Sequence, residues 1–351
     1  MLSLAASFPP NPRSSRPVYP RCRAATSGDA ALRAFHAHHC AGRALDANPA
    51  LIPALAACAR LRSAVAEAEQ LHALLVKSGV PRAVSDVHTS TSLVRAYARL
   101  GRMGDARKVF DGMTERTVVS WNVLLDALVR AAGFARHGWA QEAADLFVEM
   151  TTVHGLAPDE ATMVGFMSAV RDIGLLGLGR TAHGYAIRRE FSLDGALGVA
   201  LINMYTRCGS MGAAHNCFSS ISNKNVEHWT SVISGFAAHG HPEMALRLFN
   251  KMRQLGIEPN GVTFVAVLNA CSHGGLVEEG FKCFNLMRSM GIRPAIRHYG
   301  CLVDLLGRVG LLKEAFNLAI NLPEDPGFVI WSSLLAACPE ATTILNGRDG
   351  C

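Results

Sequence analysis

Residues 240–252 read GHPEMALRLFNKM, and the spacing of the apolar residues in this stretch decides the fold. Four residues stand at i, i+3, i+4 and i+7, the apolar stripe of an amphipathic helix: Ala245, Leu248, Phe249 and Met252. Gly240 can end a preceding helix because glycine takes the left-handed conformation at little cost. Pro242 suits the first turn of the following helix, where its missing N–H is harmless. The stretch therefore predicts a helix end, a tight turn and a second helix.

The same stripe recurs along the whole chain. A small residue opens it eight times, at spacings of 38, 37, 36, 35, 31, 35 and 35 residues: Ala68, Ala106, Ala143, Gly179, Ala214, Ala245, Gly280 and Ala315. In seven of these cases a glycine stands five residues earlier: Gly101, Gly138, Gly174, Gly209, Gly240, Gly275 and Gly310. A period in this range is typical of stacked helix pairs, each of which buries its apolar face against its neighbours. We predict an all-α fold, a right-handed α-solenoid superhelix of helix-turn-helix repeats of about 31–36 residues.

Composition narrows the possible classes further. The chain has 351 residues, of which 50% are hydrophobic, enough to bury a sizeable core. No apolar run approaches the length of a membrane span, so we expect no membrane partner. The ten cysteines form no Cys-x-x-Cys pair, and five lie in or beside the helical stripes, where a free thiol packs as a small hydrophobe: Cys208, Cys217, Cys271, Cys283 and Cys301. The formal net charge of +6 favours a polyanionic partner only weakly, because the N-terminal arginines carry most of the excess.

The first 28 residues differ from the array. They contain four arginines, five prolines and several serines, and no acidic residue precedes Asp29. This composition is typical of an organellar transit peptide. A disordered tail without a targeting role is the alternative. The composition does not separate mitochondrion from chloroplast.

Several stretches resemble one known family. They are VVSWN at 118–122, VEHWT at 226–230, ACSHGGL at 270–276 and HYGCLVDLLGR at 298–308. Their sequences and spacing resemble the plant pentatricopeptide repeat family, in the subgroup that alternates long, short and standard repeats (PLS). Residues 328–338, FVIWSSLLAAC, resemble the start of the E-type extension of editing-type members, and after Cys338 the resemblance stops. We therefore expect a truncated extension without the DYW deaminase domain.

The resemblance implies a division of the chain into segments. The predicted segments are a transit peptide at 1–28, a leader at 29–48, long repeats at 49–86, 160–194 and 261–295, short repeats at 87–117, 195–225 and 296–327, standard repeats at 118–159 and 226–260, and the extension at 328–351. Tetratricopeptide repeats, which bind peptides, are the nearest competitor. The uneven alternation of repeat lengths disfavours them.

In the family that the chain resembles, two residues of each repeat read one RNA base. Carried over, Asn122 with Asp159 would prefer uridine, and Thr230 with Asn260 would prefer adenine, so the partial target is U-N-N-A read 5′ to 3′. The remaining pairs read less clearly, because several begin with an apolar residue: Thr91 with Thr117, Val164 with Asp194, Val199 with Asn225, and Val265 with Ala295. Taken alone, each of these residues would be an ordinary helix-surface or loop position.

The repeat at 118–159 is longer than the others, with extra residues around 128–133. Six added residues are not a whole number of helical turns. Either the first helix runs long and bends at Gly133, or a loop bulges out there. Both alternatives would disturb the register between Asn122 and Asp159.

Two stretches imitate catalytic or metal sites. His241-Pro242-Glu243 matches half of the zinc deaminase signature, but the Pro-Cys-x-x-Cys half is absent, so a turn and helix start is the better interpretation. A second group has ligand-type side chains without a further pair to close a tetrahedral site: His36, His38, His39 and Cys40. We predict no enzyme activity, no cofactor, no metal and no small-molecule substrate.

The favoured hypothesis is an organellar protein that binds single-stranded RNA and acts in C-to-U editing-site recognition or another RNA processing step. A deaminase-bearing or other editing protein would then supply catalysis in trans. The alternative is a helical protein–protein scaffold or a truncated, non-functional remnant.

Overall fold

The computed structural model describes residues 30–40, 51–61, 64–77, 86–132, 137–322, 325 and 327–337. Across these residues the regular structure is helical and contains no strand, which confirms the predicted all-α class. None of the helices in this part of the chain has the length and apolar character needed to cross a membrane. The chain forms two compact units, Met1–Glu115 and Arg116–Cys351, and each is described by itself.

The first unit contains five described helices. They are α1 (Ala30–Cys40), α2 (Leu51–Arg60), α3 (Val65–Lys77), α5 (Val87–Arg99) and α6 (Met103–Asp111). Helix α2 packs against α1, α3 and α5, and α6 packs against α5. Its core is built from residues such as Leu55, Tyr97 and Phe110, which are almost completely buried.

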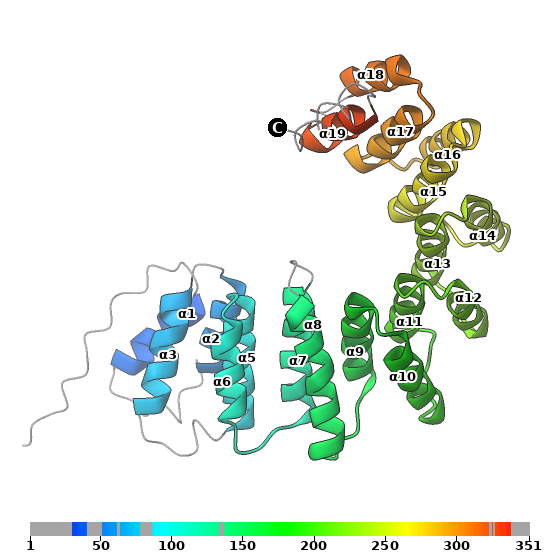
Figure 1. The fold of residues 1–351 in the computed structure, drawn as a ribbon. Coiled ribbons are helices and arrows are strands. Elements are labelled where there is room, and N and C mark those ends of the chain that lie inside the picture. Colours follow the sequence, from blue (N-terminus) through cyan, green and yellow to red (C-terminus); the bar gives the residue numbers. More distant parts are fainter. Residues whose placement is uncertain are drawn as a thin grey trace, which may run out of the picture. The chain divides into compact units, whose positions relative to one another are not determined.

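The second unit is an array of helix pairs (Figure 1). The first helices of the pairs are α7 (Val118–Ala132), α9 (Glu160–Ile173), α11 (Ala196–Arg207), α13 (Val226–Ala238), α15 (Gly261–Gly274) and α17 (Ile296–Arg308). The second helices are α8 (His137–Val148) with the π-helix η1 (Glu149–Val153), α10 (Leu176–Arg188), α12 (Met211–Ser220), α14 (Pro242–Gln254), α16 (Val277–Ser289) and α18 (Leu312–Ile320). Helix α19 (Gly327–Ala337) follows the last pair.

The first helices pack on one another in chain order, from α7 through α9, α11, α13, α15 and α17 to α19. Each second helix packs on its own first helix and on the helix that begins the next pair, or on α19 in the case of α18. Two layers result, with the first helices in one layer and the second helices in the other. The apolar stripe lies between them: Ala245, Leu248, Phe249 and Met252 are at most 5% exposed. Burial of a side chain such as Phe249 stabilises the fold by roughly 1.5–3 kcal/mol.

The glycine before each stripe ends the first helix, with one exception. Six of the seven have φ between 65° and 81°, and Gly240 at φ 71° is typical. There the His241 N–H reaches back to the Phe236 carbonyl at 3.0 Å, which closes the helix end. The exception is Gly138, which lies inside α8 without a positive φ. The prediction that Gly138 ends a helix is wrong, because α8 already begins at His137.

The lengthened standard repeat at 118–159 places most of its extra residues in the helices. Helix α7 has 15 residues where α13 has 13, and α8 begins six residues before Ala143, whereas α14 begins three residues before Ala245. After the stripe, η1 adds one residue, because the Leu156 N–H bonds to the Met150 carbonyl, while Ile257 bonds to Met252 in the standard repeat. Gly133, where the bend or bulge was expected, lies outside the described residues.

The cysteines confirm the expected thiol chemistry. Cys217, Cys271, Cys283 and Cys301 are buried free thiols, and Cys208 is half-buried and free. Burial raises the pKa of both Cys217 and Cys301 to about 12.

Candidate functional site

The stacking of first helices brings the fifth residue and the closing residue of the same repeat together in two repeats. Asn122 and Thr230, each the fifth residue of its first helix, face the residue that immediately precedes the next first helix. That preceding residue is the N-cap of the next helix, so its side chain bonds to free backbone N–H groups there. Asp159 caps α9, Asn225 caps α13 and Asn260 caps α15.

Asn122 and Asp159 meet despite the extra residues in the repeat between them. The Asn122 Nδ2 donates to both oxygens of Asp159, at 2.9 Å to Oδ1 and 3.1 Å to Oδ2. The Thr162 N–H also donates to Asp159 Oδ1 at 2.8 Å. The pKa of Asp159 is lowered even though partial burial acts to raise it, because the Thr162 backbone and hydroxyl and the Asn122 amide all donate to the carboxylate. The carboxylate therefore remains ionised, and an acceptor, at neutral pH.

Thr162 joins this pair as a third member. Its hydroxyl lies 2.6 Å from Asn122 Oδ1 and 2.7 Å from Asp159 Oδ1, and it accepts from the Asp159 N–H at 3.2 Å. Thr162 is 1% exposed, whereas Asp159 is exposed and Asn122 half-buried. Solvent or a ligand can therefore reach Asn122 and Asp159 but not Thr162.

Thr230 and Asn260 form a second group of the same design. The two side chains connect through Thr263, whose Oγ1 lies 2.8 Å from Thr230 Oγ1 and donates to Asn260 Oδ1 at 3.1 Å. Asn260 Oδ1 also accepts from the Thr263 N–H at 3.0 Å. Thr263 is fully buried, Thr230 is half-buried and Asn260 is exposed. Among the described residues, the Asn260 Nδ2 has no hydrogen-bond partner.

The predicted pairs that begin with valine are built differently. Asp194 bonds to the loop of the next repeat: its carboxylate accepts from the N–H groups of Ser222 and Asn223 at 3.0 and 3.1 Å, and from the Asn223 Nδ2 at 2.7 Å. These bonds, led by the Asn223 backbone, hold the pKa of Asp194 below its usual value. The hydrogen bonds of the Asp194 carboxylate therefore go to the loop at 222–223, and the predicted pairing of Asp194 with Val164 stays a prediction.

Histidines replace the buried threonines in two other repeats. His228 accepts from the Asn225 N–H at 3.2 Å through Nδ1, and its Nε2 lies 3.1 Å from the Leu193 carbonyl. His298 repeats this arrangement between the Ala295 N–H at 3.0 Å and the Gly261 carbonyl at 2.9 Å. These rings tie one repeat to earlier repeats, and the predicted base-reading residues there are Val199 and Val265.

Thr91 and Thr117 lie in different units. Thr91 is buried in the first unit, and its hydroxyl has no hydrogen-bond partner among the residues that the structure describes. In the second unit the Thr117 N–H donates to the Ser120 hydroxyl at 3.0 Å, which donates back to the Thr117 carbonyl at 2.8 Å.

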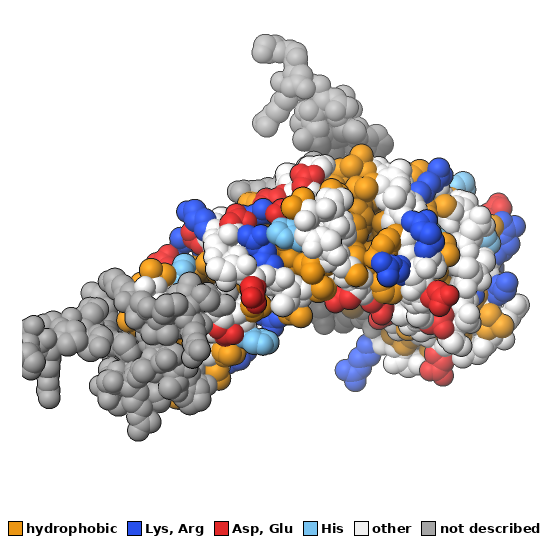
Figure 2. Space-filling model, turned by 90° about the horizontal axis from the view of Figure 1, so that it is seen from below, with side chains coloured by type: hydrophobic (Ala, Val, Ile, Leu, Met, Phe, Trp, Pro, Cys, Tyr) orange, Lys and Arg blue, Asp and Glu red, His pale blue; other side chains and the backbone are white. Residues whose placement is uncertain are grey.

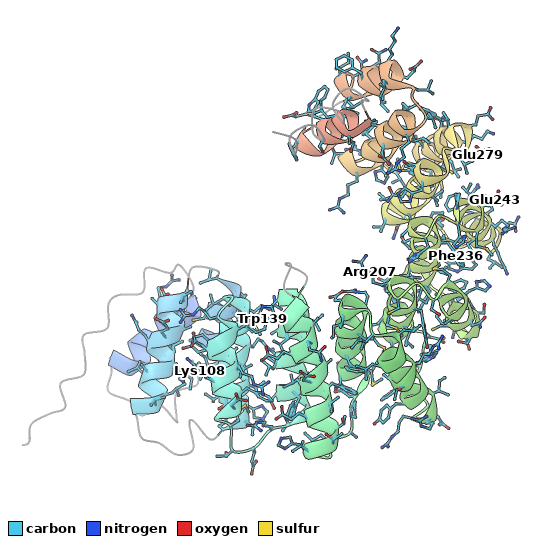
Figure 3. All side chains as sticks on the ribbon, viewed as in Figure 1. Lys108, Trp139, Arg207, Phe236, Glu243 and Glu279 are labelled. Atoms are coloured by element: carbon cyan, nitrogen blue, oxygen red, sulfur yellow. The ribbon has the colours of Figure 1, made fainter. Side chains whose placement is uncertain are left out.

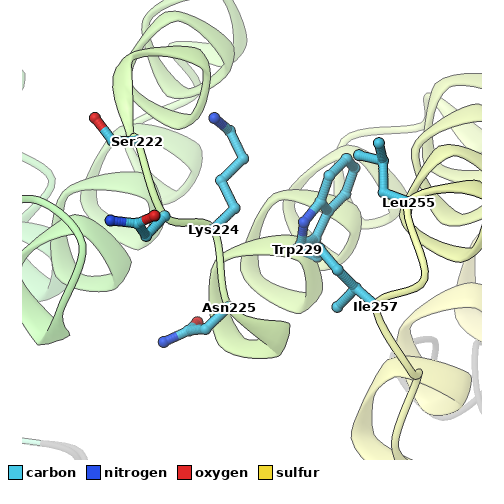
Figure 4. A pocket seen from close by; sticks show the side chains of 7 residues that line it. Ser222, Lys224, Asn225, Trp229, Leu255 and Ile257 are labelled. Carbon is cyan, nitrogen blue, oxygen red and sulfur yellow. The ribbon is translucent and has the colours of Figure 1, made fainter.

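A pocket adjoins the residue that closes the short repeat (Figure 4). Its volume is about 550 Å³, and the lining residues are Ser222, Asn223, Lys224, Asn225, Trp229, Leu255 and Ile257. The Lys224 ammonium bonds to the carbonyls of Ser219 and Ile221 and lies 5.3 Å from the Phe218 ring centre. The ammonium therefore serves the loop itself. Asn225 Oδ1 is likewise occupied by the helix cap.

Arginines in the last turn of the first helices were not predicted as site residues. Helices α7, α9, α11 and α17 each carry one: Arg130, Arg171, Arg207 and Arg308. Three pair with carboxylates, as when Arg308 Nε donates to Asp304 at 2.8 Å. Arg207 (Figure 3) is exposed and has no carboxylate partner in the described part of the chain. Basic residues recurring near predicted helix ends were the available signal.

The surface charge is mixed on the face drawn in Figure 2, where Lys, Arg, Asp and Glu side chains alternate with apolar ones.

The two stretches that resemble catalytic or metal sites give different outcomes. His241 is the N-cap of α14, and Pro242 and Glu243 form its first turn, which confirms the interpretation as a helix start. The side chains of His36, His38, His39 and Cys40 lie outside those the structure describes. Among described residues, no three His, Cys, Asp or Glu side chains gather as a metal site would require.

These features define a solenoid of helix pairs that carries a recurring polar group where successive first helices meet. Comparison with known proteins gives the repeat class. The model of the PPR repeat matches residues 88–118, 132–152 and 262–292, and the model of the PPR repeat family matches residues 224–273. These segments of the chain therefore match the pentatricopeptide repeat.

Curated relatives of this chain are also named as pentatricopeptide repeat proteins. From Arabidopsis thaliana, "Pentatricopeptide repeat-containing protein At1g59720, chloroplastic/mitochondrial" is 39% identical over 81% of this chain and 44% of its own length. "Pentatricopeptide repeat-containing protein At3g26782, mitochondrial" is 38% identical over 82% of this chain and 43% of its own length. The chain thus spans less than half the length of these relatives.

A solved structure shares the fold. The pentatricopeptide repeat protein PPR10, crystallised in complex with an 18-nt psaJ RNA element, superposes with a TM-score of 0.61 at 19% identity, over 83% of this chain and 44% of that chain. The maize PPR10 structure gives the same TM-score at 22% identity, over 92% of this chain and 47% of that one. At this identity the likeness shows the fold alone.

Proposed function

We propose that this array binds single-stranded RNA sequence-specifically, one base per repeat. The observation that carries the proposal is the group formed by Asn122 and Asp159, in which two side chains from the start and the end of one repeat meet at 2.9 Å and remain open to a ligand. Helical repeats of this kind read one base with two or three side chains. The PPR10 structure, whose name includes a bound RNA, supports RNA as the ligand class.

The hydrogen-bonding groups support the predicted base preferences. The ionised Asp159 offers acceptors, and the Asn122 amide retains one N–H donor beyond its bond to Asp159. The Watson–Crick edge of uridine presents an N–H beside a carbonyl oxygen and so complements this pair. The free Nδ2 donor of Asn260 beside the Thr230 oxygen complements the ring nitrogen and amino group of adenine. The proposed partial target is U-N-N-A, with two repeats between the two groups.

A binding competition tests the proposal. The full chain is titrated with labelled U-N-N-A RNA and with A-N-N-U RNA, in which the two bases are exchanged, both in unstructured flanks. We expect the first RNA to bind at least about tenfold more tightly, since one good base contact contributes about 1–3 kcal/mol. Equal affinity for the two RNAs, or no binding even at low salt, would overturn the proposal and favour the scaffold alternative.

A recoding variant gives the matched control. Asn122→Thr with Asp159→Asn converts the first pair into the type of the second pair and leaves Thr162 to serve as its third member. The variant is expected to prefer A-N-N-A over U-N-N-A, while its preference at the other base stays unchanged. Loss of all binding with normal helicity would contradict base reading at this pair.

We further propose that the protein works in an organelle. The names of several relatives are chloroplastic or mitochondrial and favour this location without separating the two. In the organelle the array would mark a site for C-to-U editing or another RNA processing step, with catalysis supplied by a second protein. The resemblance of residues 328–338 to the extension of editing-type members supports the editing role. Sequencing of organellar transcripts crosslinked to the protein would identify the site, and an unedited, unprocessed target set would overturn this role.

A further inference from the structure

We infer that a buried threonine of the next repeat, Thr162 or Thr263, sets the hydrogen-bond polarity of each base-reading pair and so acts as a positioning residue for base specificity. The inference rests on the proposed function. Both threonines lie three residues after the capping residue that they contact, in the repeat that follows the fifth-position residue they orient. Neither can touch RNA, because they are 1% and 0% exposed.

The contact with Thr263 leaves the Thr230 hydroxyl as a hydrogen-bond acceptor toward the ligand. The Thr263 hydroxyl accepts from the Asn260 N–H at 3.3 Å and donates its one proton to Asn260 Oδ1 at 3.1 Å. Either hydroxyl could donate across the 2.8 Å contact between Thr230 and Thr263; we assign Thr230 as the donor, because the Thr263 proton is directed at Asn260 Oδ1. Thr230 is left with lone pairs toward the ligand, and Asn260 with two N–H donors. This pattern accepts the amino group of adenine and donates to its ring nitrogen, and it opposes guanine, whose edge has the reverse polarity.

Thr162 fixes Asn122 in the opposite sense. Its hydroxyl lies 2.6 Å from Asn122 Oδ1 and 2.7 Å from Asp159 Oδ1, so its single proton is shared between these two acceptors and keeps the Asn122 oxygen turned toward Thr162. The Asn122 Nδ2 consequently points at Asp159 and at the ligand, since an amide turned around would place its oxygen against the carboxylate. The pair presents a donor beside a carboxylate acceptor, the complement of uridine. The same threonine position therefore supports two different base preferences through different partners.

The other repeats support the assignment. Where a histidine occupies the equivalent position, as at His228 and His298, the ring bonds to backbone groups and leaves no hydroxyl for the predicted base-reading residue. The predicted base-reading residues there are Val199 and Val265, which have no polarity to set. At these four junctions of the second unit, a threonine thus accompanies a polar base-reading residue, and a histidine accompanies an apolar one.

Thr162→Val and Thr263→Val test the inference, with Thr162→Ser and Thr263→Ser as matched controls that keep the hydroxyl. Affinities are measured in the full chain for RNAs that vary only the first or only the second read base. Each valine variant should reduce discrimination at its own base by about three- to tenfold, as expected for one hydrogen bond. The other base should keep its wild-type discrimination, and the serine variants should keep both.

Two outcomes overturn the inference alone: unchanged discrimination in the valine variants, or equal weakening for every RNA, which would mean that the threonines only stabilise the fold. Wild-type protein without base preference would overturn the proposed function and this inference with it. A measurement without RNA separates the structural step. In protein labelled with ¹⁵N-asparagine, Thr162→Val should shift the side-chain amide signals of Asn122, whereas Thr162→Ser should leave them in place.

Discussion

Gly198→Ala should destabilise the array at the junction between α11 and α13. Gly198 is the third residue of α11 and is buried. A Cβ there would lie 2.0 Å from the Leu193 carbonyl oxygen, 2.9 Å from His228 Nε2 and 3.0 Å from Ile221 Cδ1. The first contact involves backbone, which cannot rotate away. The Leu193 carbonyl is also the partner of the His228 ring at 3.1 Å, so the methyl group displaces both members of a buried hydrogen bond.

The expected loss of stability follows from two destabilising contributions and one stabilising contribution. Overpacking of a tight site costs about 1–3 kcal/mol, and leaving a buried polar group unpaired costs about 1–3 kcal/mol. Replacing a helical glycine by alanine returns up to about 1 kcal/mol. The net expectation is a destabilisation of about 3 kcal/mol, which corresponds to roughly a hundredfold change in the opening equilibrium.

Hydrogen–deuterium exchange measures this locally, which matters because repeat arrays need not unfold in one step. Amides of α11 and α13 should exchange roughly a hundredfold faster in Gly198→Ala than in wild type. Gly212→Ala is the matched control, because Gly212 lies in α12 without a positive φ, and a Cβ added there would meet no atom within 4 Å. If Gly198→Ala exchanges like Gly212→Ala, the reasoning is refuted. A His228→Ala background should absorb part of the cost if the clash acts through the ring.

Three further predictions concern charge and thiol chemistry. The folded-state pKa of Asp159 lies below its ordinary value of 3.8, so the carboxylate stabilises the fold at neutral pH and loses this contribution as the pH falls through and below 3.8. The difference in unfolding free energy between wild type and Asp159→Asn should therefore shrink from pH 7 to pH 3. A difference that stays constant over this range would contradict the prediction. Cys217 and Cys301 have pKa values of about 12 and should resist alkylation by iodoacetamide at pH 8 in the folded protein. Both should react fully in urea, and mass spectrometry measures the extent of labelling. Rapid labelling of the folded protein would show that they are not buried thiols. Arg207→Ala should lower by about one the slope with which the logarithm of RNA affinity falls against the logarithm of salt concentration. Arg308→Ala should change this slope less, because Asp304 already neutralises the Arg308 guanidinium. Equal effects of the two variants would argue against a phosphate contact at Arg207.

The fold was predictable because two local properties recur in register. An apolar stripe at helical spacing requires a partner surface, and a glycine five residues before it supplies the conformation that ends the preceding helix. Gly138 shows the limit of this inference. A glycine permits a positive φ but does not impose one, so α8 simply continues through Gly138, and the extra residues of the repeat lengthen its helices.

The site was predictable only in part. Sequence spacing singled out Asn122 and Asp159, which hydrogen-bond to each other, and Asp194, whose carboxylate instead bonds to the loop of the next repeat. Asp194 differs because the loop at 222–223 offers its carboxylate three donors, and no feature near Asp194 in sequence announces them. Thr162 was missed because its partner Asn122 lies 40 residues away. A threonine three residues after a capping residue was a usable signal, since it marks a capping box.

Under the proposed function, the closing residue of a repeat has two tasks, and these restrict each other. Asp159 and Asn260 must cap the next helix and also face the base, and good capping side chains are few: Ser, Thr, Asp and Asn. The choice of bases that this position can help to read is therefore limited by helix chemistry before RNA is considered. Ala295 is informative because it cannot cap through its side chain, and the ring of His298 binds its backbone N–H instead. A repeat can thus give up side-chain capping at this position, but only by giving up the polar group that would read a base.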